Sequence, residues 1–198
     1  SVFVRVLERA IEKQLLINFD VAVNEGLLDK IDDQYRFSHD RIQEAVYNMI
    51  DIKKRCIYHF EYGLALASML VGTRGDNNVL FTAVNQLNLG GTEAVADKSQ
   101  NIVVATLNLK AGKKAMDMSD FTSAYSYFDH GITFLRKNHW KEHYALSLEL
   151  YELAASCALT NGDVVILRLL SEQVVTYGRS FEDKLNVIYY ATCALASS

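Results

Sequence analysis

The chain has 198 residues, of which 50% are apolar and 22% are charged, a composition typical of a globular protein rather than a disordered one. Its net charge of −4 provides no basic footprint for nucleic acid or an anionic membrane, and no apolar run reaches transmembrane length. Cys56, Cys157 and Cys193 each lie in a helical apolar pattern, which indicates reduced core residues of a cytoplasmic protein. Because the sequence starts without Met and ends inside a helical pattern, we expect it to be a piece of a longer polypeptide.

Residues 1–50 follow the element order of a winged-helix unit. Apolar residues at helical spacing predict a first helix from Phe3 to Ile11 and a second from Leu15 to Val23, which Gly26 ends as the C′ residue. Two short strands are predicted on either side of a turn at residues 32–34, the first at residues 27–31 and the second at residues 35–37. The third helix is predicted from apolar residues that share one face: Ile42, Ala45, Val46, Met49 and Ile50.

A winged helix suggests DNA binding, but the charges of this one argue against it. The second helix, which would enter the groove, carries only Lys13 at its start against Asp20 and Glu25. Residues 1–50 contain six Lys or Arg and nine Asp or Glu. A phosphate-binding surface needs clustered cations, so we expect no nucleic-acid partner.

The segment Ser38-His39-Asp40 places rare polar residue types at the start of the third helix. Ser38 or Asp40 is predicted to cap this helix, because their oxygens can accept the free amide hydrogens of its first turn. His39 and Asp40 would then lie at the positive end of a helix dipole, a position that suits an anion or a ligand phosphate. Capping accounts for the Ser and the Asp but not for the His, so both interpretations stay open here.

From residue 51 onward the periodicity stays helical. A long helix is predicted from Cys56 to Val71, then a polar loop at residues 72–78, then a helix that the pair Gly90-Gly91 closes. A weak repeat of 43 positions follows, in which each unit is a helix, a polar turn and a second helix. The paired positions are Ala111 with Ala154, Ala115 with Ala158, Asp120 with Asp163, Phe121 with Val164, and Ala124 with Leu167.

The first of these units resembles a tetratricopeptide (TPR) repeat in its small residues at Ala111, Gly112 and Ala115 and its larger Phe128. TPR repeats stack into a solenoid with a nominal period of about 34 residues. Residues 136–141 would therefore be an inserted loop, and residues 180–196 would begin the next repeat. The element order of the first part and the repeat of the second together predict two domains, a winged-helix-like unit at residues 1–50 and a TPR-like region at residues 51–198.

Three motifs raise the question of chemistry. His139, Glu142 and His143 spell H-x-x-E-H, a zinc signature, but no third ligand is evident, and Cys56 with His59 lacks a second ligand pair. Ser38-His39-Asp40 is similar to the start of a histidine-kinase phosphoacceptor box, although the box's Pro is missing and strands precede it. No phosphate-binding Gly-rich motif occurs. We therefore expect no catalytic residue and no metal in this chain.

The segment from Tyr35 to Ala45, with residues 22–28 before it and residues 80–88 after it, resembles the post-wing region of large signalling ATPases of the AAA/STAND type. Members of this family combine a predicted ATPase module with helical repeats and a histidine kinase or Ser/Thr kinase domain. The resemblance implies that His39 senses the phosphates of ATP or ADP held by an upstream P-loop domain of the same chain, with Asp40 orienting the loop. Ser38 departs from the family, which has an apolar residue there.

Together these observations predict a mostly α fold: a small winged-helix unit with a two-stranded wing, followed by TPR-like hairpins. The expected function is non-catalytic: a regulatory and protein-interaction segment of a nucleotide-controlled signalling protein, with a protein partner on the repeats and no membrane partner. Two alternatives remain, a TPR-like scaffold without nucleotide coupling and a histidine phosphoacceptor domain.

Overall fold

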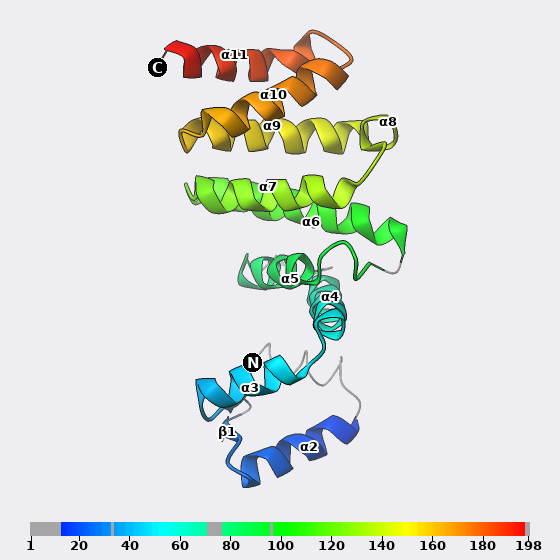
Figure 1. The fold of residues 1–198 in the computed structure, drawn as a ribbon, viewed down its shortest axis with the longest axis vertical. Coiled ribbons are helices and arrows are strands. Elements are labelled where there is room, and N and C mark those ends of the chain that lie inside the picture. Colours follow the sequence, from blue (N-terminus) through cyan, green and yellow to red (C-terminus); the bar gives the residue numbers. More distant parts are fainter. Residues whose placement is uncertain (1–12, 33, 71–76, 96, 197–198) are drawn as a thin grey trace. The chain divides into compact units, whose positions relative to one another are not determined.

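The computed structural model describes residues 13–32, 34–70, 77–95 and 97–196, and it is mostly α-helical, as predicted (Figure 1). The chain divides into two compact units between Ala94 and Val95. Each unit is described by itself below. The predicted first helix, Phe3 to Ile11, lies outside the described residues.

The first unit contains a helix, a hairpin and a second helix in the predicted order. Helix α2 (Lys13–Asn24) ends at Gly26, whose φ of 71° is in the left-handed region that glycine adopts at little cost. The Leu27 amide donates to the Ala22 carbonyl at 2.9 Å and the Gly26 amide donates to Val23 at 3.0 Å, the two bonds of a Schellman C-cap. The prediction for Gly26 is confirmed.

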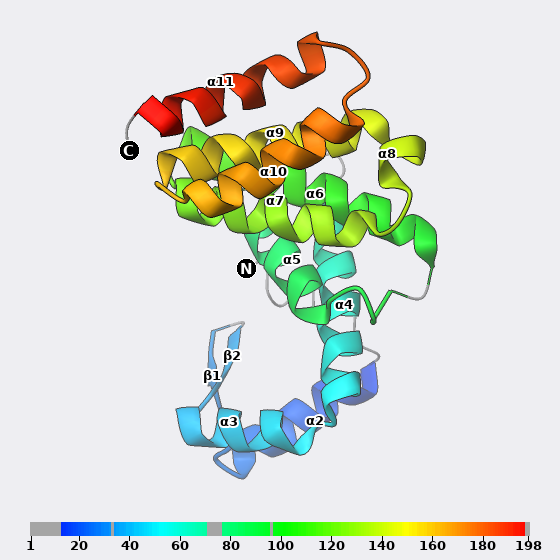
Figure 2. The ribbon, with the colours of Figure 1, turned by 45° about the horizontal axis from the view of Figure 1, so that its top comes forward.

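Strands β1 (Leu28–Ile31) and β2 (Gln34–Phe37) form an antiparallel pair, seen side by side in Figure 2. Leu28 pairs with Phe37 and Ile31 pairs with Gln34, so the predicted two-stranded hairpin is confirmed and Gln34 belongs to β2 rather than to the turn. Asp32 has a φ of 52°, a conformation that Asp tolerates better than most residues. Helix α3 (Asp40–Met49) follows.

Helices α4 (Ile52–Met69) and α5 (Asn77–Gly90) pack closely through glycines. A Cβ atom on Gly63 would lie 2.7 Å from Leu87 Cγ, and one on Gly90 would lie 2.8 Å from Phe60 Cβ. No larger residue fits either position without displacing the partner helix. Both helices are confirmed, except that Asn77 and Asn78 begin α5 instead of ending a loop.

The unit boundary at residues 94 and 95 differs from the predicted one at residue 50. One reason is that Arg55 of α4 contacts the end of α3. Its Nε donates to the Ile50 carbonyl at 2.7 Å, and its guanidinium lies 4.5 Å from the centroid of the Tyr47 ring. Helices α4 and α5 therefore share a compact unit with the hairpin.

The second unit is a row of helices that pack largely in chain order (Figure 1). Their bounds are α6 (Lys98–Asp117), α7 (Phe121–Leu135), α8 (His139–Glu142), α9 (Tyr144–Thr160), α10 (Val164–Tyr177) and α11 (Glu182–Ala196). Helix α6 packs on α7, α7 on α9 and α9 on α10, while α11 contacts both α9 and α10. The inserted loop predicted at residues 136–141 is partly helical, because α8 begins at His139.

The turns α6–α7 and α9–α10 are built in the same way at positions 43 apart. Ser119 and Gly162 occupy the left-handed C′ position, with φ of 62° and 77°. The next residue is an aspartate whose amide bonds back to the first helix: Asp120 to Ala115 at 3.0 Å and Asp163 to Ala158 at 2.9 Å. Each aspartate also caps the second helix by accepting a backbone N–H three residues later at 3.0 Å.

The core of each hairpin combines small and large residues differently. A Cβ atom on Gly112 would lie 2.3 Å from Phe128 Cε1, so the fully buried Phe128 ring packs directly on the α6 backbone. The equivalent positions 43 residues later are Ala155 and Ser171. The repeat predicted from the sequence is therefore present in the geometry of the turns. The two hairpins differ in their cores, where a Gly and a Phe of the first hairpin are replaced by an Ala and a Ser in the second.

Candidate functional site

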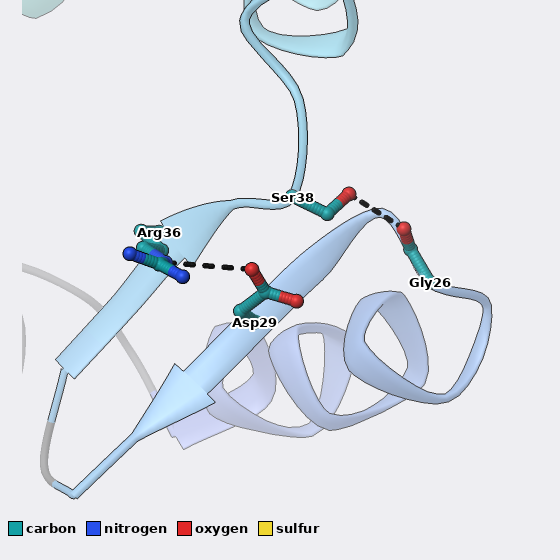
Figure 3. Close-up of polar contacts among 4 residues, drawn as sticks. All are labelled: Gly26, Asp29, Arg36 and Ser38. Atoms are coloured by element: carbon teal, nitrogen blue, oxygen red, sulfur yellow. Dashed lines mark hydrogen bonds and ion pairs between the residues drawn. The ribbon is translucent and has the colours of Figure 1, made fainter.

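Ser38 connects the end of the hairpin back to the turn that precedes it. Its hydroxyl donates to the Gly26 carbonyl at 2.6 Å (Figure 3). Its amide donates to the Leu27 carbonyl at 3.2 Å. Gly26 in turn is fixed by the Schellman cap of α2. Ser38 thus determines where the chain leaves β2 and where α3 begins.

Polar and aromatic contacts join the two strands to each other and hold the hairpin against α2. Asp29 and Arg36 are register partners, and Arg36 Nε lies 3.4 Å from an Asp29 carboxylate oxygen (Figure 3). The Tyr35 hydroxyl donates to Asp20 at 3.2 Å, and the Tyr35 ring stacks on Phe19 with centroids 5.1 Å apart. The ion pair is exposed and contributes little, so the aromatic contact is the stronger support.

His39 is the N-cap residue of α3, with φ −146° and ψ 138°, and its side chain makes no capping hydrogen bond. The prediction that Ser38 or Asp40 caps this helix is wrong. Ser38 lies one residue too early and its hydroxyl is bonded to Gly26, while Asp40 is the first helical residue. An acidic residue in the first turn still interacts favourably with the helix dipole.

His39 and Asp40 are both exposed, so His39 is not packed under the hairpin. An imidazole at an N-cap breaks the usual preference for Ser, Thr, Asp or Asn, which would satisfy an amide of the first turn. Such local departures concentrate at functional positions. The His39 imidazole and the first amides of the ten-residue helix α3 are therefore accessible at the same point. This arrangement suits an anionic partner.

A chain of hydrogen bonds connects α3 with α4 and α5. The Tyr47 hydroxyl lies 3.0 Å from His59 Nε2, and His59 Nδ1 lies 2.6 Å from the Gln86 amide oxygen. Since that oxygen can only accept, Nδ1 carries the proton and, in a neutral ring, Nε2 accepts from Tyr47. The sequence singled out His59 only beside Cys56 as a possible metal pair. Its bonding partners, 12 and 27 residues away, give no local signal.

The H-x-x-E-H motif does not assemble a ligand set. His139 Nδ1 lies 2.9 Å from the Ser147 hydroxyl, which itself donates to the His143 carbonyl at 2.9 Å, so Nδ1–H is the donor to Ser147. Burial, and secondarily the neighbouring His143, lower the pKa of His139. Among the described residues, no group of three or more His, Cys, Asp or Glu side chains is placed to hold a metal ion.

The cysteines are less buried than predicted. Cys157 is in the core, and burial raises its pKa to about 11. Cys56 and Cys193 are only partly buried, and all three are free thiols. The prediction of core cysteines therefore holds for Cys157 alone. None of the helices in the described ranges is long and apolar enough to cross a membrane.

Comparison with known proteins identifies one similarity. The chain is 26% identical to hybrid signal transduction histidine kinase G of Dictyostelium discoideum over an alignment of 141 residues. The match covers 60% of this chain and 4% of the kinase, so the chain spans a small part of that protein's length. No protein-family profile matches the chain, and no solved structure matches it. The similarity connects the chain with a signal-transduction protein at the level of sequence.

Proposed function

We propose that this chain is a non-catalytic regulatory and protein-interaction segment of a signal-transduction protein. The observation that carries the proposal is the pair of hairpins whose turns are the same at positions 43 apart. Stacked helical hairpins expose extended surfaces that suit partner binding. Their cores consist mainly of Ala, Leu, Val and Phe, a composition that serves packing rather than chemistry.

The similarity to a hybrid histidine kinase supports the signalling part of this proposal. A long kinase contains segments other than its catalytic domains, and this chain aligns with only 4% of that protein. The chain would act in the cytoplasm, where such a kinase meets its nucleotide. Catalysis would belong to other domains of the parent protein.

The finer proposal is that an upstream P-loop ATPase domain of the AAA/STAND type, in the same polypeptide, contacts residues 13–50. The exposed His39, at the start of α3, would hydrogen-bond the phosphates of ATP or ADP, and Asp40 would orient the first turn. The Tyr47–His59–Gln86 chain would then transmit the position of α3 to α4 and α5. A nucleotide shifts such an equilibrium only by its differential affinity for the two arrangements.

A scaffold without nucleotide coupling is the second candidate, favoured by the fact that residues 95–198 form a compact unit of their own. Under that alternative the hairpins would bind a partner regardless of the state of His39. A phosphoacceptor role for His39 is the third candidate, which its exposure permits. It requires acid-labile phosphate on His39.

The proposed function is tested by removing residues 95–198 from the parent protein as one unit. We expect the catalytic activity of the parent to persist while its response to the activating signal is lost. Loss of all activity would assign a catalytic or essential structural role to the segment. An unchanged response would show that the segment does not regulate.

A further inference from the structure

A cavity of about 730 Å³ lies where the α7–α9 connection meets the α10–α11 connection. Both connections lie at the same end of the second unit, as Figures 1 and 2 agree. Its lining includes two aromatic residues, Trp140 and Tyr177, and four cationic residues: Arg136, Lys137, Lys141 and Arg179. Its volume is in the range of ligand pockets.

The charge of this cavity is opposite to that of the chain. Four of its lining residues are Lys or Arg and none is Asp or Glu, whereas the whole chain has a net charge of −4. Lys137 and Lys141 are exposed, and no ion pair within the described ranges includes either of them. A concave surface with charges of one sign concentrates its field on an opposite charge.

Aromatic contacts order Trp140 and one of the four cations, Arg179. Trp140 stacks on Tyr177 with centroids 5.4 Å apart and packs on Tyr151 at 5.0 Å. The Arg179 guanidinium lies 3.9 Å from the Tyr144 ring centroid, and the Arg179 amide donates to the Tyr144 hydroxyl at 2.7 Å. The Arg179 side chain is therefore positioned before a ligand arrives, which lowers the entropy that this residue loses on binding.

Trp140 adds an unused hydrogen-bond donor. Its indole nitrogen is buried and has no hydrogen-bond partner in the described part of the chain. An indole N–H can only donate, and a buried donor without an acceptor is unfavourable.

The backbone of the α7–α9 connection is unusual in the same place. Arg136 has φ 58° and ψ −156°, and Asn138 has φ 65° and ψ 9°, both in regions that non-glycine residues rarely occupy. The connection also makes the repeat longer than the nominal period of about 34 residues. Insertions in helical repeats commonly form the binding face.

These observations favour a flexible ligand with several negative charges. The faces of Trp140 and Tyr177 pack on each other and on neighbouring rings, which disfavours a stacked nucleotide base. The four cations come from two separate connections, so an extended ligand whose negative charges are spaced along it can meet cations on both. We propose that this cavity binds an acidic peptide segment of a partner protein, with two or more Asp or Glu side chains. This site does not depend on nucleotide coupling through His39.

Trp140 is the one tryptophan of the 198 residues, so its fluorescence reports on the cavity alone. We would titrate the full chain with a Glu-rich peptide, with the matched Gln-rich peptide, and with pyrophosphate. We expect a saturable change in Trp140 fluorescence with the Glu-rich peptide, weakening as ionic strength rises. No change with that peptide at low salt, or an equal response to the Gln-rich peptide, would overturn the proposal.

Paired substitutions separate local recognition from overall charge. The variant Lys137→Gln/Lys141→Gln should bind the Glu-rich peptide roughly tenfold more weakly, because it loses two charge contacts. The matched control Lys110→Gln/Lys114→Gln removes two charges from α6 of the same unit and should bind like the wild type. Equal weakening in both variants would mean non-specific attraction. Pyrophosphate binding as tightly as the peptide would assign the cavity to a small polyanion and overturn the peptide proposal.

Discussion

The contact between Gly112 and Phe128 provides a sharp test of how the first hairpin of the second unit is packed. A Cβ atom at Gly112 would lie 2.3 Å from Phe128 Cε1, 2.6 Å from Cδ1 and 2.7 Å from Cζ. Carbon atoms in contact prefer roughly 3.5 Å, so the ring would have to move by about 1.2 Å. Phe128 is fully buried, and a close-packed core offers no room for that shift.

We therefore expect Gly112→Ala to destabilise the protein although alanine favours helices. The gain in helix propensity is about 1 kcal/mol, and overpacking a core typically costs about 1–3 kcal/mol. Because three ring atoms are affected, we expect a net loss of roughly 1–2 kcal/mol in the free energy of unfolding. For a unit of this size, each kcal/mol lowers the melting temperature by roughly 4 °C.

The assay is thermal and urea unfolding followed by circular dichroism, with a double-mutant cycle. Phe128→Leu alone should destabilise by leaving space. Combined with Gly112→Ala, it should cost less than the sum of the two single changes, because the new methyl group occupies part of that space. Strict additivity, or a Gly112→Ala protein more stable than the wild type, would refute the packing described here.

Three further predictions concern single side chains. His39→Asp should stabilise α3 by about 0.5–1 kcal/mol in urea unfolding, since it supplies the missing N-cap acceptor; no gain would mean that the His39 side chain already supports the helix. Hydrogen bonds from the Ser123 side chain and amide lower the pKa of Asp120 below its unfolded value. The stability that Asp120 contributes is therefore present above about pH 4 and is lost as pH falls. Asp120→Asn keeps a cap acceptor but has no carboxyl group, so its free energy of unfolding should fall less steeply on the acid side. A pH dependence identical to that of the wild type would contradict this. Cys157, with its pKa raised to about 11 by burial, should react with a thiol reagent at about pH 8 only after urea is added, unlike Cys56 and Cys193.

Local patterns predicted the elements whose causes are local. Gly26 ends α2, a two-stranded hairpin follows, and the 43-residue spacing identified hairpins that turn out to share their turn geometry. In each case the determining contacts lie within a few residues of one another. A C′ glycine or an N-cap aspartate satisfies backbone groups of its own helix end.

The features that sequence reasoning missed depend on contacts between distant residues. From the sequence alone Ser38 is a plausible N-cap, but its hydroxyl donates to the Gly26 carbonyl, which lies 12 residues earlier. The cavity beside Trp140 was not predicted, because it requires Arg179 from another connection to lie against the inserted one. A cluster of Arg136, Lys137 and Lys141 around one tryptophan was the available signal.

The finer proposal, that nucleotide state controls this segment through His39, is tested most directly by the rate of ADP release from the parent protein. We would compare the wild type with His39→Ala and with Gln43→Ala, an exposed position on the same helix. The account predicts faster ADP release and raised basal activity for His39→Ala, and wild-type behaviour for Gln43→Ala. Identical ADP release from all three proteins would contradict it.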